Sequence, residues 1–229
     1  MRGPESSSVW VVCPAFNEAT AIGGVLSDLS RTDYHVVVVD DCSCDATRDI
    51  ATELGATVIS HPINLGQGAA LKTGIGYALS QGAAYIVTFD ADGQHRVGDI
   101  PRLLDALDHS RADFALGSRF LTPSPIVPIG RRLLLKAATL FTVAMTGLRL
   151  TDTHDGLRAF TRRGASVFHL RQNRMAHASE ILGQIARSGL RYVEVPVTIE
   201  YTPYTMAKGQ RAGDLIMVLL DLFAQRLYR

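Results

Sequence analysis

The first 120 residues alternate short, uninterrupted apolar runs with amphipathic helical patterns. Because the apolar runs contain no regular polar alternation, they are typical of strands buried on both faces of a parallel sheet. The predicted strands span residues 9–13, 35–39, 57–59, 85–89 and 114–116, and the predicted helices span 18–29, 46–54, 67–79 and 100–107. Strands that alternate with helices predict an α/β fold with a doubly wound, mostly parallel sheet.

The rest of the chain has a less regular pattern. Three prolines between Leu121 and Gly130 predict a loop. Beyond it we expect helices at 131–146, 176–187 and 214–227, extended segments at 158–161 and 192–201, and a loop at 202–210. No shift in composition marks a boundary, so the prediction is one domain over residues 1–229, with C-terminal helical additions.

Composition narrows the class of protein. The formal net charge is +1, which gives no indication of a nucleic-acid binder. Cys13, Cys42 and Cys44 are odd in number and lack zinc-site spacing, so we expect reduced thiols in a cytoplasmic protein. Residues 1–8 have no apolar stretch typical of a signal peptide. The sequence contains no run of roughly 20 uncharged apolar residues, so we expect no transmembrane helix.

Polar clusters directly follow four of the predicted strands. They are Pro14-Ala15-Phe16-Asn17-Glu18, Asp40-Asp41-Cys42-Ser43-Cys44-Asp45, the segment from Asp90 to His95, and Gly117-Ser118-Arg119-Phe120. Ligands of open parallel sheets bind in the crevice outside the carboxyl ends of the strands. The four clusters are therefore expected to converge on one site.

The acidic segment after the fourth predicted strand is the candidate metal site. Asp90, Asp92 and Gln94 alternate, so an extended backbone points all three side chains to one side. Two carboxylates and an amide oxygen suit Mg²⁺ or Mn²⁺. Such a cation bridges the phosphates of a nucleoside diphosphate and neutralises the leaving group. The alternative is a simple turn at Asp92-Gly93.

The first two clusters are candidates for nucleoside binding. Phe16 offers a flat surface and Glu18 an acceptor, with a core position and a helix-dipole role as the alternatives. Asp41 is assigned a hydrogen bond from a ribose hydroxyl or a base N–H. Ser43 or Asp45 is expected to cap the next helix. The loop Asn64-Leu65-Gly66-Gln67-Gly68 allows a close backbone approach to a ligand, although such a glycine loop is a weak signal.

A second acidic cluster, Asp152-Thr153-His154-Asp155-Gly156-Leu157-Arg158, lies late in the chain. One of its carboxylates is a candidate general base for an acceptor hydroxyl. The alternative is a hydrogen-bonded structural loop. Arg119 is a candidate ligand for an anion. The histidines at 61, 95, 154, 169 and 177 show no metal-ligand spacing and are expected to be mostly structural or exposed.

Taken together, these motifs resemble those of inverting family-2 glycosyltransferases with the GT-A (Rossmann-like) fold. The nearest groups are the dolichyl- and polyprenyl-phosphate sugar transferases. The resemblance covers residues 9–208. It rests on Pro14-x-Phe16-Asn17-Glu18, Asp40-Asp41-x-Ser43-x-Asp45, Asn64-x-Gly66-x-Gly68, Asp90-x-Asp92-x-Gln94-His95, Gly117-Ser118-Arg119-Phe120 and Asp152-x3-Gly156-x-Arg158.

The resemblance implies a role for each matching residue. Pro14, Phe16, Glu18, Asp41 and Asp90 would bind the nucleotide, and Asp90, Asp92 and Gln94 the metal and diphosphate. Arg119 and Arg131 would match the arginines that meet an acceptor phosphate, and Asp152 the family's late acidic position. Lys208 is a further candidate for the acceptor phosphate, and Asp155 or Asp152 is the candidate catalytic base for a hydroxyl acceptor. Residues 1–120 would then bind the nucleotide sugar, and residues 121–229 would form the acceptor side.

Two positions depart from the family pattern. Asp155 stands where the lipid-phosphate enzymes usually have a small or neutral residue. A tyrosine-rich loop, Tyr201-Thr202-Pro203-Tyr204, replaces an arginine expected shortly before Lys208. The late segment also resembles bacterial surface-polysaccharide transferases, so both a polyprenyl phosphate and a glycan hydroxyl stand as acceptors.

The expected protein is an inverting glycosyltransferase of bacterial cell-surface polysaccharide synthesis, using a UDP- or GDP-sugar. The alternatives are a non-catalytic nucleotide-sugar-binding protein and a sugar nucleotidyltransferase, although the latter normally has a glycine-rich phosphate loop after its first strand. Two apolar helices, at 131–146 and 214–227, predict peripheral contact with the inner face of the cytoplasmic membrane. Packing on the core or in a homodimer is the alternative.

Overall fold

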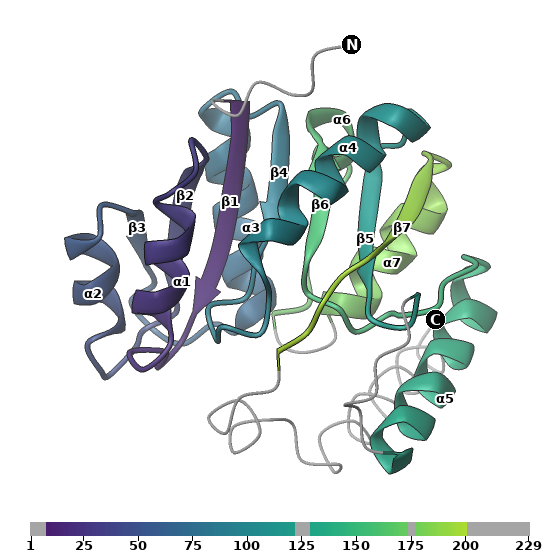
Figure 1. The fold of residues 1–229 in the computed structure, drawn as a ribbon, viewed down its shortest axis with the longest axis horizontal. Helices are drawn as coiled ribbons and strands as arrows, with labels where there is room; N and C mark the ends of the chain where they lie inside the picture. Colours follow the sequence, from purple (N-terminus) through teal and green to yellow (C-terminus); the bar gives the residue numbers. More distant parts are fainter. Residues whose placement is uncertain (1–7, 122–128, 174–176, 201–229) are drawn as a thin grey trace.

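The computed structural model describes residues 8–121, 129–173 and 177–200. Their centre is a sheet of seven strands in the order β3-β2-β1-β4-β6-β5-β7 (Figure 1). The strands are β1 (Val9–Ala15), β2 (His35–Asp40), β3 (Thr57–Ser60), β4 (Tyr85–Thr88), β5 (Phe114–Ser118), β6 (Arg158–Thr161) and β7 (Tyr192–Pro196). The predicted α/β fold is confirmed.

Most strand pairs are parallel, and β6 is the exception. β1 pairs in parallel with β2 and β4, β2 with β3, and β5 with β7. β6 runs antiparallel to both β4 and β5, between which it lies. Because β6 runs the opposite way, the loop that enters it reaches the sheet edge where β4 and β5 end. The late acidic cluster is thereby placed beside the other polar loops.

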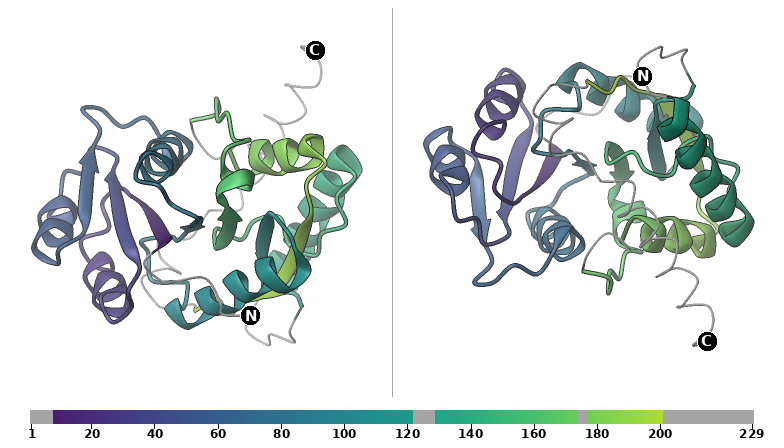
Figure 2. Two further views of the ribbon diagram at one scale, coloured as in Figure 1. Left: turned by 90° about the horizontal axis from the view of Figure 1, so that it is seen from above. Right: turned by 90° about the horizontal axis from the view of Figure 1, so that it is seen from below.

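Helices cover both faces of the sheet (Figure 2). They are α1 (Ile22–Leu29), α2 (Thr47–Glu53), α3 (Gln67–Ser80), α4 (Ile100–Ser110), α5 (Ile129–Thr146), α6 (Arg162–Ala165) and α7 (His177–Ser188), with a short 3-10 turn η2 (Val97–Asp99). One core cluster joins α1, α2 and α4 to the sheet, and the other joins α3 and α7 to its opposite face. This two-sided burial accounts for the continuous apolar strands.

Helix α3 packs closely on the sheet through small residues. A Cβ atom added at Gly74 would lie 2.3 Å from Val12 Cγ1 on β1. Only glycine permits this approach of the helix to the strand. Since α3 begins beside the polar loops, the close packing also fixes the position of its first turn.

Two predicted element boundaries are wrong. The helix expected from Glu18 begins at Ile22. The amides of Glu18 and Ala19 precede it and donate to the side chains of Thr47, at the start of α2, and Asp45. The strand expected over 192–201 ends at Pro196. Beyond it, the amide of Thr198 donates to Asp99 Oδ2 at 2.8 Å, outside the ladder with β5. The helix predicted at 214–227 and the loop at 202–210 lie outside the described residues.

Helix α5 has an unusual distribution of exposed side chains. Ala138, Thr139 and Thr142 are buried, whereas Leu140 and Met145 are 71% and 43% exposed. Within residues 8–121, 129–173 and 177–200, no helix is long and apolar enough to cross a membrane.

Candidate active site

The loops that follow β1 and β2 form one hydrogen-bonded unit. Asn17, which has a φ of 54°, donates its amide to Ser43 Oγ at 2.9 Å and accepts the Cys44 amide at 2.8 Å. The Glu18 amide donates to Thr47 Oγ1 at 2.8 Å. Ser43 therefore joins the two loops and does not cap α2, contrary to one of the two alternatives for that helix.

The other side chains of these loops differ in exposure. Asp45 accepts the amide of Thr47, the first residue of α2, at 3.0 Å, as expected of a residue that stabilises the helix start. Pro14 is buried at the end of β1. Phe16 is 42% exposed, which excludes a core position for its ring. The nucleoside-binding roles of Pro14, Phe16 and Glu18 stay predictions.

Asp41 is surrounded by donors from the protein. Its Oδ1 accepts the Leu65 amide at 2.9 Å and lies 2.7 Å from His61 Nδ1, and its Oδ2 accepts the Gly66 amide at 2.6 Å. The side chain is only 4% exposed. A hydrogen bond from a nucleoside to Asp41 stays a prediction, and in this conformation both carboxylate oxygens already accept hydrogen bonds.

The acidic segment after β4 contacts the start of helix α3 and is held together by its own hydrogen bonds. Asp90 Oδ1 accepts from Gln67 Nε2 on α3 at 3.1 Å, and Asp90 Oδ2 lies 3.0 Å from His95 Nε2. Asp92 Oδ1 accepts the Gln94 amide at 2.9 Å. The Asp90 side chain is 29% exposed, and Asp92 and Gln94 are half-buried. Carboxylate oxygen therefore remains accessible from solvent.

The two carboxylates of this segment have pKa values shifted in opposite directions. Burial and the charge of Asp90 together raise the pKa of Asp92 to about 6. Burial alone would raise the pKa of Asp90, but the hydrogen bond and charge of His95 outweigh it and lower that pKa. Burial likewise opposes the charged form of His95, but contact with Asp90 and the charge of Asp155 raise its pKa to about 9. Asp90 and His95 thus form an ion pair beside a second, repelled carboxylate.

These residues fit a divalent cation that takes part of its coordination from substrate. The described residues contain no group of three His, Cys, Asp or Glu side chains arranged around a metal. Mg²⁺ is commonly held by one or two carboxylates, with phosphates and water completing its shell. The mutual repulsion of Asp90 and Asp92 is the electrostatic condition that such a cation relieves.

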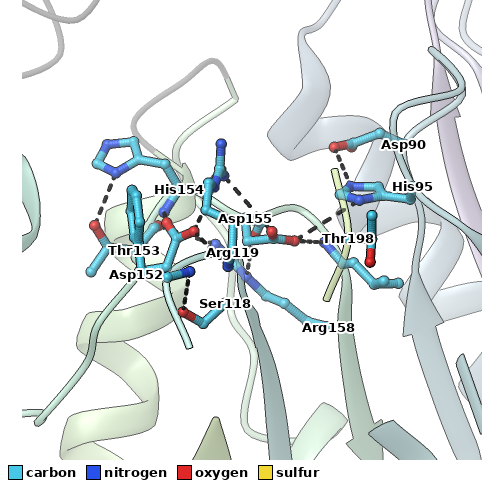
Figure 3. A network of polar contacts seen from close by, with 12 residues as sticks. Asp90, His95, Ser118, Arg119, Asp152, Thr153, His154, Asp155, Arg158 and Thr198 are labelled. Carbon is cyan, nitrogen blue, oxygen red and sulfur yellow. Dashed lines mark hydrogen bonds and ion pairs between the residues drawn. The ribbon is translucent and has the colours of Figure 1, made fainter. Parts of the chain in front are cut away.

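The late acidic loop is closed by Arg119, which directly follows β5 (Figure 3). Arg119 Nε donates to Asp152 Oδ2 at 2.6 Å, and Arg119 Nη2 donates to the His154 carbonyl at 3.0 Å. Asp152 Oδ1 accepts the His154 amide at 3.0 Å. The side chains of Arg119 and Asp152 are 9% and 1% exposed. Arg119 is therefore engaged with the protein, and its expected contact with an acceptor phosphate stays a prediction.

Asp155 is buried to the same degree as Asp152. Its Oδ1 accepts the Leu157 amide at 2.9 Å, and its Oδ2 lies 3.8 Å from Arg119 Nη2. The side chain is 1% exposed. Burial raises the pKa of Asp155, although the charges of His95 and Arg119 oppose the increase. Among the described residues, Asp155 Oδ2 and His95 Nδ1 are buried without a hydrogen-bond partner.

Gly156 brings the two acidic segments into contact. A Cβ atom at this position would lie 2.2 Å from Asp90 Oδ2. The Gly156 carbonyl accepts from Thr88 Oγ1, at the end of β4, at 2.7 Å. The absence of a side chain is therefore required for the Asp90 carboxylate to lie against the late loop.

Sequence reasoning missed several residues that hold these loops. Glu194 on β7 accepts the Thr151 amide at 2.8 Å and the Asp152 amide at 3.2 Å. The segment after β7 also supports the first acidic loop, since the Glu200 amide donates to the Gln94 carbonyl at 2.8 Å. The sequence indicated only an extended segment at 192–201 for this region. The Arg131 side chain and Lys208 lie outside the described residues.

Comparison with known proteins identifies the family to which the chain belongs. The model of the glycosyl transferase family 2 matches residues 10–168, which is most of the chain. The chain belongs to this family. The resemblance noted from the sequence motifs is thus confirmed, and the protein is a glycosyltransferase.

Relatives in the family cover nearly the whole chain. It is 31% identical to a UDP-N-acetylglucosamine–dolichyl-phosphate N-acetylglucosaminyltransferase of Methanococcus voltae, over 88% of this chain and 89% of that protein. It is 32% identical to an undecaprenyl-phosphate mannosyltransferase of Micrococcus luteus, over 91% and 89% respectively. The two relatives differ in sugar and share a polyprenyl-type phosphate in their names.

A solved structure supports the fold. Glucosyl-3-phosphoglycerate synthase from Mycobacterium tuberculosis, in complex with Mn²⁺ and UDP-glucose, superposes with a TM-score of 0.70. The match covers 96% of this chain and 78% of that one, at 20% identity. This likeness confirms the GT-A architecture.

Proposed function

We propose that this glycosyltransferase moves a sugar from a UDP- or GDP-sugar to a polyprenyl phosphate, with inversion at the anomeric carbon. The biological setting we propose is bacterial cell-surface polysaccharide synthesis. The support is the accessible carboxylate pair at Asp90 and Asp92, the sealed late loop, and the relatives that act on lipid phosphates. Family membership favours this function over a nucleotidyltransferase or a non-catalytic binder.

The donor is proposed to lie against the ends of β1, β2 and β4. Phe16 would present its exposed ring to the nucleoside, with Pro14 and Glu18 beside it. Asp90, Asp92 and Gln94 would hold Mg²⁺ or Mn²⁺ at the diphosphate. When bound, the cation supplies positive charge that stabilises the departing nucleoside diphosphate. Gln67 and His95 orient Asp90 by hydrogen bonds to its two oxygens.

The burial of the late-loop carboxylates is the observation that carries the proposal, because it bears on the choice of acceptor. A hydroxyl acceptor requires a carboxylate within hydrogen-bond reach to remove its proton. The side chains of Asp152 and Asp155 are each 1% exposed, and Arg119 occupies the space beside both. A phosphate acceptor is already anionic and needs no base. The sealed carboxylates therefore favour a lipid phosphate.

Helix α5 supports contact with the membrane that contains such an acceptor. Ala138, Thr139 and Thr142 are buried and Val143 packs against a core cluster, while the large apolar side chain of Leu140 is 71% exposed on the opposite side. Large apolar side chains on the outer face of a surface helix are typical of interfacial helices. We propose peripheral association with the inner face of the cytoplasmic membrane through this face of α5. A second copy of the chain is the competing partner for the same surface.

The deciding experiment compares two lipids that differ only in the phosphate. Purified protein is incubated with radiolabelled UDP- or GDP-sugars and Mn²⁺, together with either a polyprenyl phosphate or the polyprenol of equal length. Label should enter the organic phase only with the phosphate, and EDTA should abolish it. Equal transfer to polyprenol, or transfer only to a soluble glycan, would overturn the proposed acceptor. Donor binding without any transfer would favour the alternative of a non-catalytic nucleotide-sugar-binding protein.

A further inference from the structure

A buried carboxylate–imidazole pair lies beside the donor loops. Asp41 follows β2 and His61 follows β3, and Asp41 Oδ1 lies 2.7 Å from His61 Nδ1. Because a carboxylate only accepts hydrogen bonds, Nδ1 is the donor. On the other side of the ring, His61 Nε2 lies 2.9 Å from the Thr73 hydroxyl on α3. The two side chains are 4% and 9% exposed. The pair therefore ties the ends of β2 and β3 to α3.

The same carboxylate holds the glycine loop. Asp41 Oδ1 accepts the Leu65 amide at 2.9 Å and Oδ2 accepts the Gly66 amide at 2.6 Å. The Asn64 side chain returns a hydrogen bond to the Asp41 carbonyl at 3.2 Å. Gly66 has a φ of 97°, a conformation that other residues rarely adopt. Charge-assisted bonds to two successive amides thus fix this turn in one conformation.

The turn leads directly to the candidate metal ligands. Gln67 follows Gly66 and is the first residue of α3. Its side chain donates to Asp90 Oδ1 at 3.1 Å. A displacement of Gly66 therefore displaces the group that orients Asp90. A path of hydrogen bonds and one peptide link runs from His61 through Asp41 and Gly66 to Asp90.

We propose that Asp41 and His61 are positioning residues of the donor site. They hold the loop at residues 64–68 so that Gln67 fixes the Asp90 carboxylate for the cation and diphosphate. The catalytic consequence rests on the proposed function, whereas the structural consequence does not. Direct contact between Asp41 and the nucleoside is the rival explanation, and the experiment separates the two.

Hydrogen exchange tests the structural step without any activity assay. In Asp41→Asn, the side-chain amide group faces backbone donors, so an acceptor is lost at Leu65 or Gly66. At least one of these two amides should exchange roughly tenfold faster, while the amides of β1 keep their protection. Asp49→Asn, at an exposed position on α2, is the control and should change neither set. Unchanged exchange at Leu65 and Gly66 would overturn the proposal, and weaker UDP binding in the same variant would then indicate the nucleoside contact.

Variants at His61 test the functional step. His61→Phe keeps a flat ring and removes both nitrogens, whereas His61→Gln keeps a donor. We expect Mn²⁺–UDP affinity measured by calorimetry to fall roughly tenfold in the Phe variant and to be largely retained in the Gln variant. The kcat should fall with it, at an unchanged KM for the lipid acceptor.

Control variants keep this test decisive. His169→Gln, at an exposed histidine, should behave as wild type. If His61→Phe does not fold, Thr73→Val removes the hydroxyl partner and should show a smaller loss in the same direction. Wild-type Mn²⁺–UDP affinity in a folded His61→Phe would overturn the coupling. If wild-type protein transfers no sugar, the proposed function fails, while exchange and calorimetry still decide the role of the pair.

Discussion

The two acidic loops at this sheet edge have similar sequences and opposite environments. In the loop after β4, Asp90 is 29% exposed and Asp92 is half-buried beside it, with a raised pKa. In the loop before β6, Asp152 and Asp155 are each 1% exposed and lie against Arg119. Carboxylates that repel each other at an accessible edge are suited to a cation. Carboxylates that are enclosed with an arginine stabilise the loop that contains them.

The largest effect on activity is expected from a substitution at Asp92, in the accessible loop. Asp92→Ala should reduce sugar transfer roughly a thousandfold or more, because the donor diphosphate loses a cation ligand. The thermal midpoint should stay near that of wild type, since this carboxylate is repelled in the folded state. Transfer assays with and without EDTA measure the first effect, and calorimetric melting measures the second. Asp28→Ala on the exposed face of α1 is the matched control. Turnover that persists in Asp92→Ala under EDTA would refute the metal site.

The next largest effect is expected on stability, at Asp152. Asp152→Ala leaves the Arg119 guanidinium buried without its closest partner, which should cost about 3 kcal/mol in the free energy of unfolding. Urea denaturation measures this cost. The double variant Arg119→Met/Asp152→Ala should regain part of it, because the unpaired charge is gone. Equal or greater loss in the double variant would show that the pair is not the source of the stability.

A smaller effect is expected where the loops touch. Gly156→Ala places a methyl group 2.2 Å from Asp90 Oδ2, so either the loop or the carboxylate must shift. We expect a cost of about 1–3 kcal/mol in stability, as for other overpacked positions, and weaker Mn²⁺–UDP binding. Gly98→Ala, where a Cβ atom meets nothing within 4 Å, should leave both quantities near wild type. If the two variants had the same stability and the same Mn²⁺–UDP affinity, the contact between Gly156 and Asp90 would have no effect on the donor site.

The smallest effect is expected at the outer support of the late loop. Glu194→Gln retains one acceptor oxygen and loses the charge that receives the amides of Thr151 and Asp152. A loss of about 1 kcal/mol in unfolding free energy follows, with kcat almost unchanged. A large fall in kcat at normal stability would instead place Glu194 in the chemistry.

Much of the fold could be predicted because each element carried a local signal. The buried runs at Val9–Ala15 and His35–Asp40 and the glycine-bearing pattern of α3 fixed type and approximate limits. The place of β6 could not be predicted. Four residues, Arg158–Thr161, have no pattern that indicates which strands they join or in which direction. That placement is set by tertiary packing between β4 and β5.

The candidate site also has features that the sequence predicts and features that it does not. Asp90 and Asp92 could be singled out because polar residues after a buried strand are visible in sequence, and Asp155 because it lies in a second acidic cluster. The sequence did not reveal which of them solvent reaches, since Arg119 meets Asp152 across 33 positions of chain. Gln67 and His61 were equally hidden, because their partners Asp90 and Asp41 lie on other loops. Contacts of this kind depend on strand order, which local patterns do not encode.

The central claim is that the carboxylates of the late loop stabilise its structure and that none of them is a catalytic base. The most direct test is kcat of Asp155→Asn with a polyprenyl phosphate acceptor. Asparagine is isosteric and keeps the oxygen that accepts the Leu157 amide. We predict that the folded variant retains kcat within roughly tenfold of wild type, because an anionic acceptor needs no proton removed. A thousandfold fall in kcat at unchanged stability and donor affinity would identify Asp155 as the base and contradict the account.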